Sequence, residues 1–450
     1  MKPGNCITAL VILAGGLWEF AFCQAVAGQE QTPYRLTLAD AIQKGLQENL
    51  NVLLSGARLQ GAEGTRERRL AAALLPRVNA QTYANIQNRD LRAFGITIPG
   101  MPEVVGPFSN YDIRLYAQQN IVDRQSLHGL KASERALDAD KLDDEDARDL
   151  IVRAIGALYL NAESAKARTK AAQSRVNDSD TLYKLAKDKH DAGTATGVDV
   201  LRAGVQLAND RRALLIAQND DKLAILSLAR NLGMTPGISL ELAEALEFKP
   251  LAGQSAEELV PDALAARADY QSLAAQRQAL AEQQRANHAR AYPKLSINGN
   301  FGAIGRSVGG IQPTGLLQAQ VDFTIFDRDR EGEAQELTAQ IKSIDDRIAD
   351  LRRGIDEDVR QALLNLESAA EQVDVAQQGQ ALAQRELAMA QDRFQQGTAN
   401  NVEVVTAQDE LARAEENYIL AVSSHVDAKF ALARALGHTQ KNIVEFGEKQ

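Results

Sequence analysis

Four segments of the chain alternate apolar and polar residues, and each is about ten residues long or a little longer. They lie at about residues 76–88, 111–122, 293–304 and 316–326. A period of two predicts strands with one apolar and one polar face. Strands of this length can cross a bilayer at the tilt of a membrane barrel. The alternative is a soluble antiparallel sheet with one exposed face.

Long stretches between and after these segments carry a helical pattern. No proline occurs from residue 125 to residue 190, and apolar residues recur there at spacings of three and four. Steps of seven follow, as in Val200, Leu207 and Leu214. These patterns predict long helices that pack as coiled coils. At 1.5 Å per residue, a helix of about 65 residues is roughly 100 Å long, which suits a duct across a periplasm better than a compact domain.

One phrase occurs twice in the chain. It reads DAGTATGVDV at 191–200 and QQGTANNVEV at 395–404, and its glycines Gly193 and Gly397 are 397 − 193 = 204 residues apart. The same offset relates the motif ARNLG to the motif ARALG, each followed by a change of pattern. The chain is therefore a duplicated unit.

Each copy of the phrase is interpreted as the tip of a helical hairpin. Gly193 and Gly397 can take the left-handed conformation that terminates a helix. Thr194 and Thr398 are expected to begin the cap of the next helix, and the valines that follow reopen the apolar seam.

The expected fold is mainly α-helical with a membrane β-barrel. Each repeat contains a helix, two of the strands and one long helical hairpin. The predicted organisation is a signal peptide at 1–27, a first repeat at 28–233 with its tip near 193, an inter-repeat segment at 234–262, a second repeat at 263–437 with its tip near 397, and a C-terminal tail at 438–450.

The amino-terminal segment has the features of a secretory signal. Lys2 precedes the apolar run ITALVILAGGL, and Ala25-Val26-Ala27 has the small-x-small form of a cleavage site. A membrane anchor and a lipoprotein signal cut before Cys23 are the rival interpretations. Both cysteines, Cys6 and Cys23, lie in this segment, so the mature chain is expected to contain no thiol, which excludes disulfides and cysteine-ligated metals.

No later stretch approaches the roughly 18 apolar residues of a membrane-spanning helix. Any membrane span in the mature chain would then have to belong to a closed barrel. Natural membrane barrels have at least about eight strands, so several chains would have to contribute to one barrel.

Charge and motif content exclude several classes of function. Asp and Glu number 60 against 50 Lys and Arg, and the basic residues are interspersed, so nucleic acid is not an expected partner. Phosphate-loop, zinc-protease and nucleophile-elbow motifs are absent, and the five histidines show no ligand-like spacing. The acidic run at 143–146 is interpreted as a solvated helix face. We therefore expect no catalytic residues, no metal and no cofactor.

Several motifs together resemble the TolC-type outer-membrane efflux proteins. They are LTLADAIQKGLQENL at 36–50, the strand entries LLPRVNAQ and AYPKLSIN, FDRDR after the last strand, the Gly-Thr tips, and ARNLG with ARALG. The resemblance implies a homotrimer whose twelve strands form one barrel among the lipids of a Gram-negative-type outer membrane. It also implies a helical tunnel that continues the barrel into the periplasm.

The resemblance further implies that the hairpin tips dock a periplasmic adaptor protein, which connects the channel to an inner-membrane pump. The residues expected in this docking surface are Gly193, Thr194, Val198, Gly397, Thr398 and Val402.

Members of the family close the tunnel with a tyrosine, an arginine and aspartates near the second tip. The tyrosine position is Phe394 here, the arginine position is Ala399 and the first aspartate position is Glu403, with Asp199 as its equivalent in the first copy. Asp199, Phe394 and Glu403 are therefore expected at a periplasmic constriction, where three Glu403 carboxylates would favour cations. The alternative is that both acids only complement their helix dipoles.

The predicted function is the exit duct of a tripartite efflux system for small molecules, without enzymatic activity. Type I protein secretion and metal-cation efflux are alternatives within the same class. A structural periplasmic coiled-coil protein without a pore is an alternative from another class, and a secreted hydrolase is a third.

Overall fold

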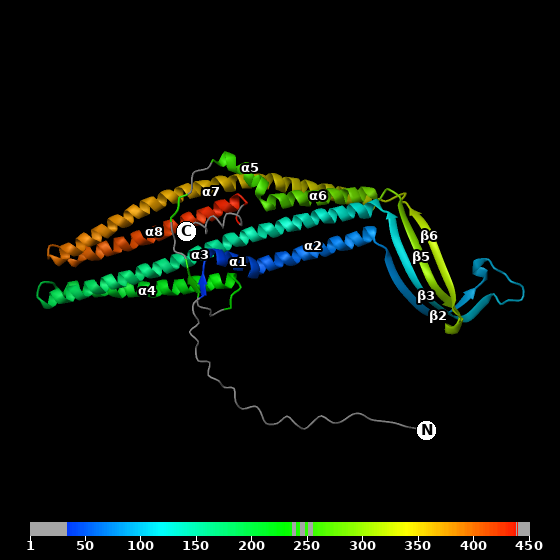
Figure 1. The fold of residues 1–450 in the computed structure, drawn as a ribbon, viewed down its shortest axis with the longest axis horizontal. Helices are drawn as coiled ribbons and strands as arrows, with labels where there is room; N and C mark the ends of the chain where they lie inside the picture. The colour runs from blue at the N-terminus through cyan, green and yellow to red at the C-terminus, as the bar shows by residue number, and fades with distance from the viewer. Residues whose placement is uncertain (1–33, 236–239, 244–247, 251–254, 438, 440–450) are drawn as a thin grey trace, which may run out of the picture.

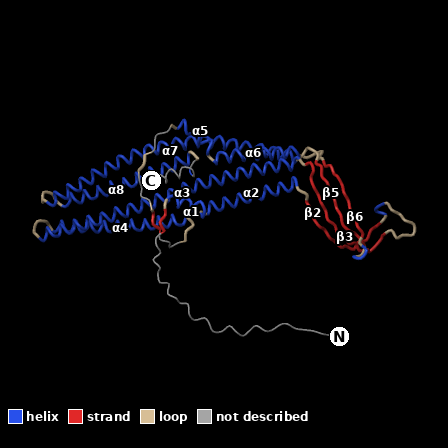
Figure 2. Tube along the Cα trace, viewed as in Figure 1, coloured by secondary structure: helices blue, strands red, loops and turns tan. Residues whose placement is uncertain are grey.

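The computed structural model describes residues 34–235, 240–243, 248–250, 255–437 and 439. The molecule is long and narrow, with a four-stranded sheet at one end and the tips of two helical hairpins at the other (Figure 1). Figure 2 shows that the strands of this sheet gather at that end, while helices make up most of the rest. The predicted signal peptide, and the predicted tail apart from residue 439, lie outside the described residues.

The first copy begins with a short strand and two helices, which are followed by a hairpin of strands and a hairpin of long helices. Its elements are β1 (Tyr34–Leu36), α1 (Leu38–Glu48), α2 (Leu50–Leu74), β2 (Arg77–Asp90), the 3-10 turn η1 (Arg92–Phe94), β3 (Val104–Val122), α3 (Arg124–Asp191) and α4 (Gly197–Asn231).

The second copy repeats this order. Its elements are β4 (Leu240–Leu242), α5 (Ala256–Ala266), α6 (Ala268–Ala289), β5 (Lys294–Gly305), the 3-10 turn η2 (Val308–Gly310), β6 (Gln312–Asp322), α7 (Asp329–Gln395) and α8 (Asn401–Ala435).

The ends of the long helices obey the offset read from the sequence. The last residues of α3 and α7 differ by 395 − 191 = 204, and the first residues of α4 and α8 differ by 401 − 197 = 204. The predicted start of the second repeat at 263 falls inside α5. α5 takes the place that α1 has in the first copy, although it contains Pro261, a residue that usually ends a helix.

The large sheet is antiparallel throughout, in the order β2-β3-β5-β6. β3 and β5 pair across the two copies, which leaves β2 and β6 as the edges. Residues of the predicted apolar face are exposed, among them Val78, Ile113 and Phe301. On the other face the carboxylate of Asp112, 1% exposed, accepts a hydrogen bond from the Tyr83 hydroxyl at 2.8 Å.

Two strands differ from the prediction by several residues. β3 begins at Val104, seven residues before the predicted start at 111. β6 begins at Gln312 and ends at Asp322, in each case four residues before the predicted 316 and 326. Phe323 and Ile325 therefore lie beyond the sheet, where they are 66% and 90% exposed. The early start of β3 includes Gly106 and Pro107, which together lie opposite the single residue Asn88 of β2, at a bulge in β3. Such a position tolerates a residue without an N–H donor.

The two helical hairpins pack side by side through α3 and α8. Asp123, the N-cap of α3, and Asp327, two residues before α7, each accept a hydrogen bond from a backbone N–H in the first turn of the helix. Along the contact between α3 and α8, ion pairs join the helices at three places: Asp146–Arg434 at 2.5 Å, Arg153–Asp427 at 2.5 Å and Arg168–Glu416 at 2.8 Å. Arg434 also lies 3.9 Å from Asp149. The two copies are thereby joined along most of the length of α8.

None of the helices in the described part of the chain combines the length and the apolar character required to cross a membrane.

Candidate functional site at the hairpin tips

Both tips terminate the preceding helix with the same backbone geometry. Gly193 follows α3 with a φ of 73°, and Gly397 follows α7 with a φ of 74°. In each tip the next N–H, from Thr194 or Thr398, donates to the carbonyl five residues earlier, at 2.8 Å and 3.0 Å. This hydrogen bond across a glycine in the left-handed region is a standard end of an α-helix.

The two threonines do not begin the next helices, so that prediction was wrong. The hydroxyls of Thr194 and Thr398 donate to the same carbonyls as their N–H groups, at 3.0 Å and 3.1 Å, and so complete the end of the preceding helix. The caps of α4 and α8 are instead Thr196 and Asn400. A threonine hydroxyl can serve either end of a helix, and here the orphan carbonyl of the preceding helix is the nearer partner.

Asp199 takes part in the cap of its own helix. Its carboxylate accepts hydrogen bonds from the Thr196 hydroxyl at 2.7 Å and from the Thr196 N–H at 3.0 Å, while the Thr196 hydroxyl accepts from the Asp199 N–H. The hydrogen bond from the Thr196 hydroxyl lowers the pKa of the Asp199 carboxyl below its ordinary value. This reciprocal arrangement is a capping box.

Glu403 occupies the equivalent position in the second tip but has a different partner. The side chain of Asn400 accepts hydrogen bonds from the Val402 and Glu403 N–H groups, so the cap does not use the Glu403 carboxylate. That carboxylate pairs with Arg393 at 3.0 Å, and both side chains are about half exposed. An arginine therefore does pair with Glu403 at this tip. It is Arg393 in the last turn of α7, and not a residue at position 399, where the family has its arginine.

The expected docking valines remain exposed at the tips. Val198 is 60% exposed and Val402 is 41% exposed, whereas Val404, two residues further along, is fully buried. Each tip thus presents one apolar side chain beside its glycine.

Phe394 lies inside the protomer, between the two hairpins. Its ring is 5% exposed. The core cluster that contains it also contains Leu182 and Ala186 of α3, Ala203 of α4, Leu387 and Ala390 of α7, and Val404 and Ala407 of α8. A role of Phe394 in closure would therefore act through the position of the hairpins.

Two cross-tip contacts were not predicted from the sequence. The Lys189 ammonium of the first hairpin donates to the carbonyls of Phe394 and Gln395 at 2.7 Å and 3.1 Å, and lies 4.9 Å from the centroid of the Phe394 ring. In the opposite direction, the buried Asn401 amide donates to the Asp199 carbonyl at 2.9 Å. Lysine in a last helical turn is a known partner of terminal carbonyls, but the sequence does not show that these carbonyls belong to another helix.

Within the described residues, no group of three or more His, Cys, Asp and Glu side chains is placed to hold a metal ion. The tips therefore offer apolar side chains, backbone groups and a few paired charges, which suit contact with another protein or with a passing solute.

The profile of one protein family, described as outer membrane efflux protein, matches residues 41–234 and 259–438. The chain belongs to this family. The two matched segments correspond to the two copies, and they confirm the resemblance that the sequence motifs indicated.

Known members of the outer membrane efflux protein family are similar over most of this chain. The pyoverdine export outer membrane protein OpmQ of Pseudomonas aeruginosa is 23% identical over 384 residues, which are 81% of this chain and 78% of that protein. The solved structure of the outer membrane protein VceC from Vibrio cholerae has a TM-score of 0.76 at 18% identity, covering 89% of this chain and 96% of that chain. The Campylobacter jejuni CmeC outer membrane channel also gives a TM-score of 0.76, at 16% identity, with 94% of each chain covered.

These comparisons confirm the predicted fold class, a helical tunnel continuous with a strand region, and the outer-membrane location. The family is one of outer-membrane channels and not one of enzymes. The chain is accordingly an efflux channel protein of the outer membrane.

Proposed function

We propose that three copies of this chain form the exit duct of a tripartite efflux system, which carries small molecules from an inner-membrane pump and its periplasmic adaptor to the exterior. The observation that carries this proposal is the separation of two surfaces along one rod. A sheet with two open edges and an apolar outer face lies at one end, and a pair of exposed hairpin tips lies at the other (Figure 1).

The open edges of the sheet support assembly of several chains. β2 and β6 each leave one row of backbone N–H and C=O groups without a strand partner among the described residues. In lipid each unpaired group costs several kcal/mol, so the edges must pair with other copies. Three copies with four strands each supply 3 × 4 = 12 strands, enough to close a barrel.

Docking of an adaptor is proposed for the far end of the rod. Gly193, Thr194 and Val198 form one tip, and Gly397, Thr398 and Val402 form the other. Both tips are exposed and share one backbone geometry. Hydrogen bonds from Lys189 and Asn401 hold them side by side in the folded protomer. A trimer would present six such tips in a ring, a repeated surface that a ring of adaptor hairpins can match.

Closure of the duct is proposed for the same end. Asp199, Phe394 and Glu403 all lie within the last turns of the hairpins, and Phe394 with Lys189 fixes the second hairpin against the first. A movement of the α7–α8 hairpin away from the α3–α4 hairpin would therefore break this packing and widen the tip.

Small molecules are the proposed cargo because of the names of relatives. One relative is named for pyoverdine export and another for toluene efflux, and both substances are small molecules. No feature of the described residues favours protein cargo.

The test combines fractionation with co-purification. The affinity-tagged chain is expected in the outer membrane as a heat-modifiable trimer, and it should retain an adaptor and a pump from its own host after mild cross-linking. A soluble monomer would contradict the channel assignment. A membrane trimer that retains no adaptor, even with photo-reactive residues at Val198 and Val402, would contradict docking at the tips.

A further inference from the structure

We propose that His425 is a pH-sensitive contact between α8 and the segment that links the two copies. The described residues of this linking segment are 240–243 and 248–250. While its ring is neutral, His425 keeps the segment on α8, and protonation releases the segment and frees the α7–α8 hairpin to move. The proposal rests on the proposed closure of the duct and adds the condition that loosens it.

The linking segment is attached to the first hairpin at one end. There β4 pairs with β1 in a two-stranded parallel sheet, which lies between the large sheet and the tips (Figure 2). The Lys166 ammonium of α3 donates a hydrogen bond to the Leu242 carbonyl of β4 at 2.8 Å. The Leu242 side chain is 3% exposed and belongs to a core cluster with residues of α3 and α4. Backbone pairing and apolar burial therefore hold this end.

The other end of the linking segment is attached to the second hairpin. Phe248, six residues after Leu242, packs against a buried cluster that includes Val373 of α7 and Val422 of α8. Its ring also meets the His425 ring edge to face, with the centroids 4.7 Å apart and the planes at 62°. The segment thus connects the two hairpins over a short length of chain, and His425 lies under its second attachment.

The His425 ring is buried without a hydrogen-bond partner. It is 0% exposed, and neither ring nitrogen has a partner within the described part of the chain. Buried polar groups are nearly always hydrogen-bonded, so this position is unusual. The neutral ring has one N–H donor and can still pack as an aromatic ring. A protonated ring would bring a full charge and two N–H donors into a place that offers them no acceptor.

The nearest charge on α8 and in the linking segment is positive. Lys429, one turn after His425, is 8% exposed, and its ammonium donates to the Lys249 carbonyl. The same lysine therefore fixes the linking segment and would repel a protonated His425 ring.

The other helices around this place supply no compensating acid. α7 contributes Val373 and Ala376 to the cluster, and α8 contributes the Tyr418 ring, which is neutral at ordinary pH. Asp427, two residues after His425, pairs with Arg153 of α3 at 2.5 Å. Among the described residues, Lys429 is the charged group that acts on the His425 ring, and no carboxylate offsets it.

These surroundings set the direction in which pH acts. Burial, and then the charge of Lys429, lower the pKa of the His425 ring below its ordinary value of about 6.5. Once the segment is released, water reaches the ring and it titrates near that ordinary value. The attachment is therefore complete above about pH 6.5, and it weakens as the pH falls from there through the lower pKa of the buried ring.

This arrangement belongs to the second copy alone. The positions equivalent to His425 and Lys429 in the first copy are 425 − 204 = 221 and 429 − 204 = 225, where α4 has Asp221 and Ile225. Ile225 packs against the core cluster of the first hairpin. Acid should therefore loosen the α7–α8 hairpin, the one whose movement is proposed to widen the tip, and leave the attachment at Leu242 in place.

Hydrogen exchange of the full-length trimer tests the contact. The readout is the α8 segment 418–430, which lies under the linking segment, with rates corrected for the pH dependence of intrinsic exchange. From about pH 7.5 to about pH 5, exchange there should rise severalfold in the wild type. His425→Phe keeps a ring against Phe248 but cannot titrate, so it should show no rise. If that variant does not assemble, His425→Leu gives the same test with a smaller side chain.

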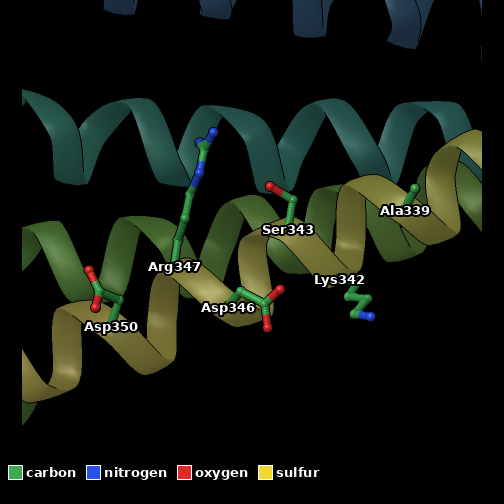
Figure 3. A pocket seen from close by; sticks show the side chains of 6 residues that line it. All are labelled: Ala339, Lys342, Ser343, Asp346, Arg347 and Asp350. Carbon is green, nitrogen blue, oxygen red and sulfur yellow. The ribbon is translucent and has the colours of Figure 1, made fainter.

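Two control variants exclude titration elsewhere. His288→Phe removes an exposed histidine of α6. Asp346→Asn removes an exposed carboxylate from an open hollow of about 460 Å³, whose lining residues all belong to α7 (Figure 3). Both variants should keep the rise that the wild type shows.

The outcomes separate this proposal from the proposed function. A wild type without the rise, or an equal rise in His425→Phe, would overturn the pH-sensitive contact and leave the channel intact. Planar-bilayer recording then tests the consequence, because the open fraction should rise severalfold over the same pH interval in the wild type and not in His425→Phe. Exchange that responds while the open fraction does not would overturn the regulation. A wild type without any conductance would contradict the proposed function itself.

Discussion

The two hairpin tips share one backbone and differ in how their acids are used. Asp199 belongs to the cap of its own helix, whereas Glu403 pairs with Arg393 and leaves the cap to Asn400. Duplication has thus kept the geometry that ends and restarts the helices, while the side chains have diverged. Backbone geometry is the shared requirement of both tips, and side-chain chemistry is specific to each.

The tips also depend on each other unequally. The second tip contributes the buried Phe394, and the first tip contributes the Lys189 ammonium that holds the carbonyl end of α7. The Asn401 amide of the second tip holds the Asp199 carbonyl of the first in return, so the asymmetry is confined to the end of α7. Loss of the Phe394 and Lys189 contacts should free α7 and α8 more than α3 and α4.

Removal of the Phe394 ring should have the largest effect on this asymmetry. Loss of a buried Phe side chain costs about 3–5 kcal/mol, so Phe394→Ala should loosen the second tip strongly. Limited proteolysis near Gly397 should become faster while cleavage near Gly193 changes less. Cells that make this variant should also become sensitive to large antibiotics. The control is Phe94→Ala, at a ring that is 62% exposed and far from the tips, and equal proteolysis of both variants would contradict the account.

Substitution of the tip glycines should affect both tips alike. A left-handed backbone costs a residue other than glycine roughly 1–2 kcal/mol, and a β-branched residue tolerates it least. Gly193→Val and Gly397→Val should each reduce adaptor cross-linking and export while membrane trimers persist.

Gly379→Val is the matched control, because Gly379 lies within α7 and an added Cβ would meet nothing within 4 Å. Export that falls as much in the control as in the tip variants would show that tip geometry is not the cause.

Loss of the Lys189 ammonium should have a smaller effect. A hydrogen bond from a charged group contributes about 1.5–3 kcal/mol when buried, and partial exposure reduces this to about 1 kcal/mol. Lys189→Met should therefore raise hydrogen exchange at the end of α7, with Lys187→Met, an exposed lysine two residues away, as the control. Equal hydrogen exchange in both variants would show that the Lys189 hydrogen bonds do not stabilise the end of α7.

The smallest effect concerns pH at the first tip. The folded pKa of Asp199 is below its ordinary value of about 3.9, so its contribution is complete above that value and is lost as pH falls through the folded pKa. We expect the cap amides of the first tip to lose protection below about pH 4, by less than about 1 kcal/mol. The Val402 amide, bonded to Asn400, serves as the reference, and Asp199→Asn should abolish the difference.

Periodicity and the repeat predicted much of the fold from the sequence. The 204-residue offset located both tips, because glycine is the residue that a left-handed helix end requires. Alternation located the sheet, but Gly106-Pro107 reads as a loop although β3 continues through it. Pro313 is the second residue of β6, and it reads as a loop in the same way, which explains why the predicted start at 316 is four residues late.

The side-chain contacts at the tips could not be predicted from the sequence in the same way. Lys189 and Arg393 occupy equivalent positions, 393 − 189 = 204, yet one reaches across to the other hairpin and the other stays with Glu403. Which side chain crosses depends on how the hairpins lie against each other, and no local pattern encodes that. The same holds for Phe394, whose burial follows from packing between helices that are far apart in the sequence.

Planar-bilayer recording of the purified protein tests the central claim, that the tips close an efflux duct, most directly. We predict that the wild type opens rarely and prefers cations, that Phe394→Ala raises the open fraction severalfold, and that Glu403→Gln weakens ion preference while the open fraction changes little. A wild type without conductance, or an open fraction in Phe394→Ala no higher than in Glu403→Gln, would contradict the account.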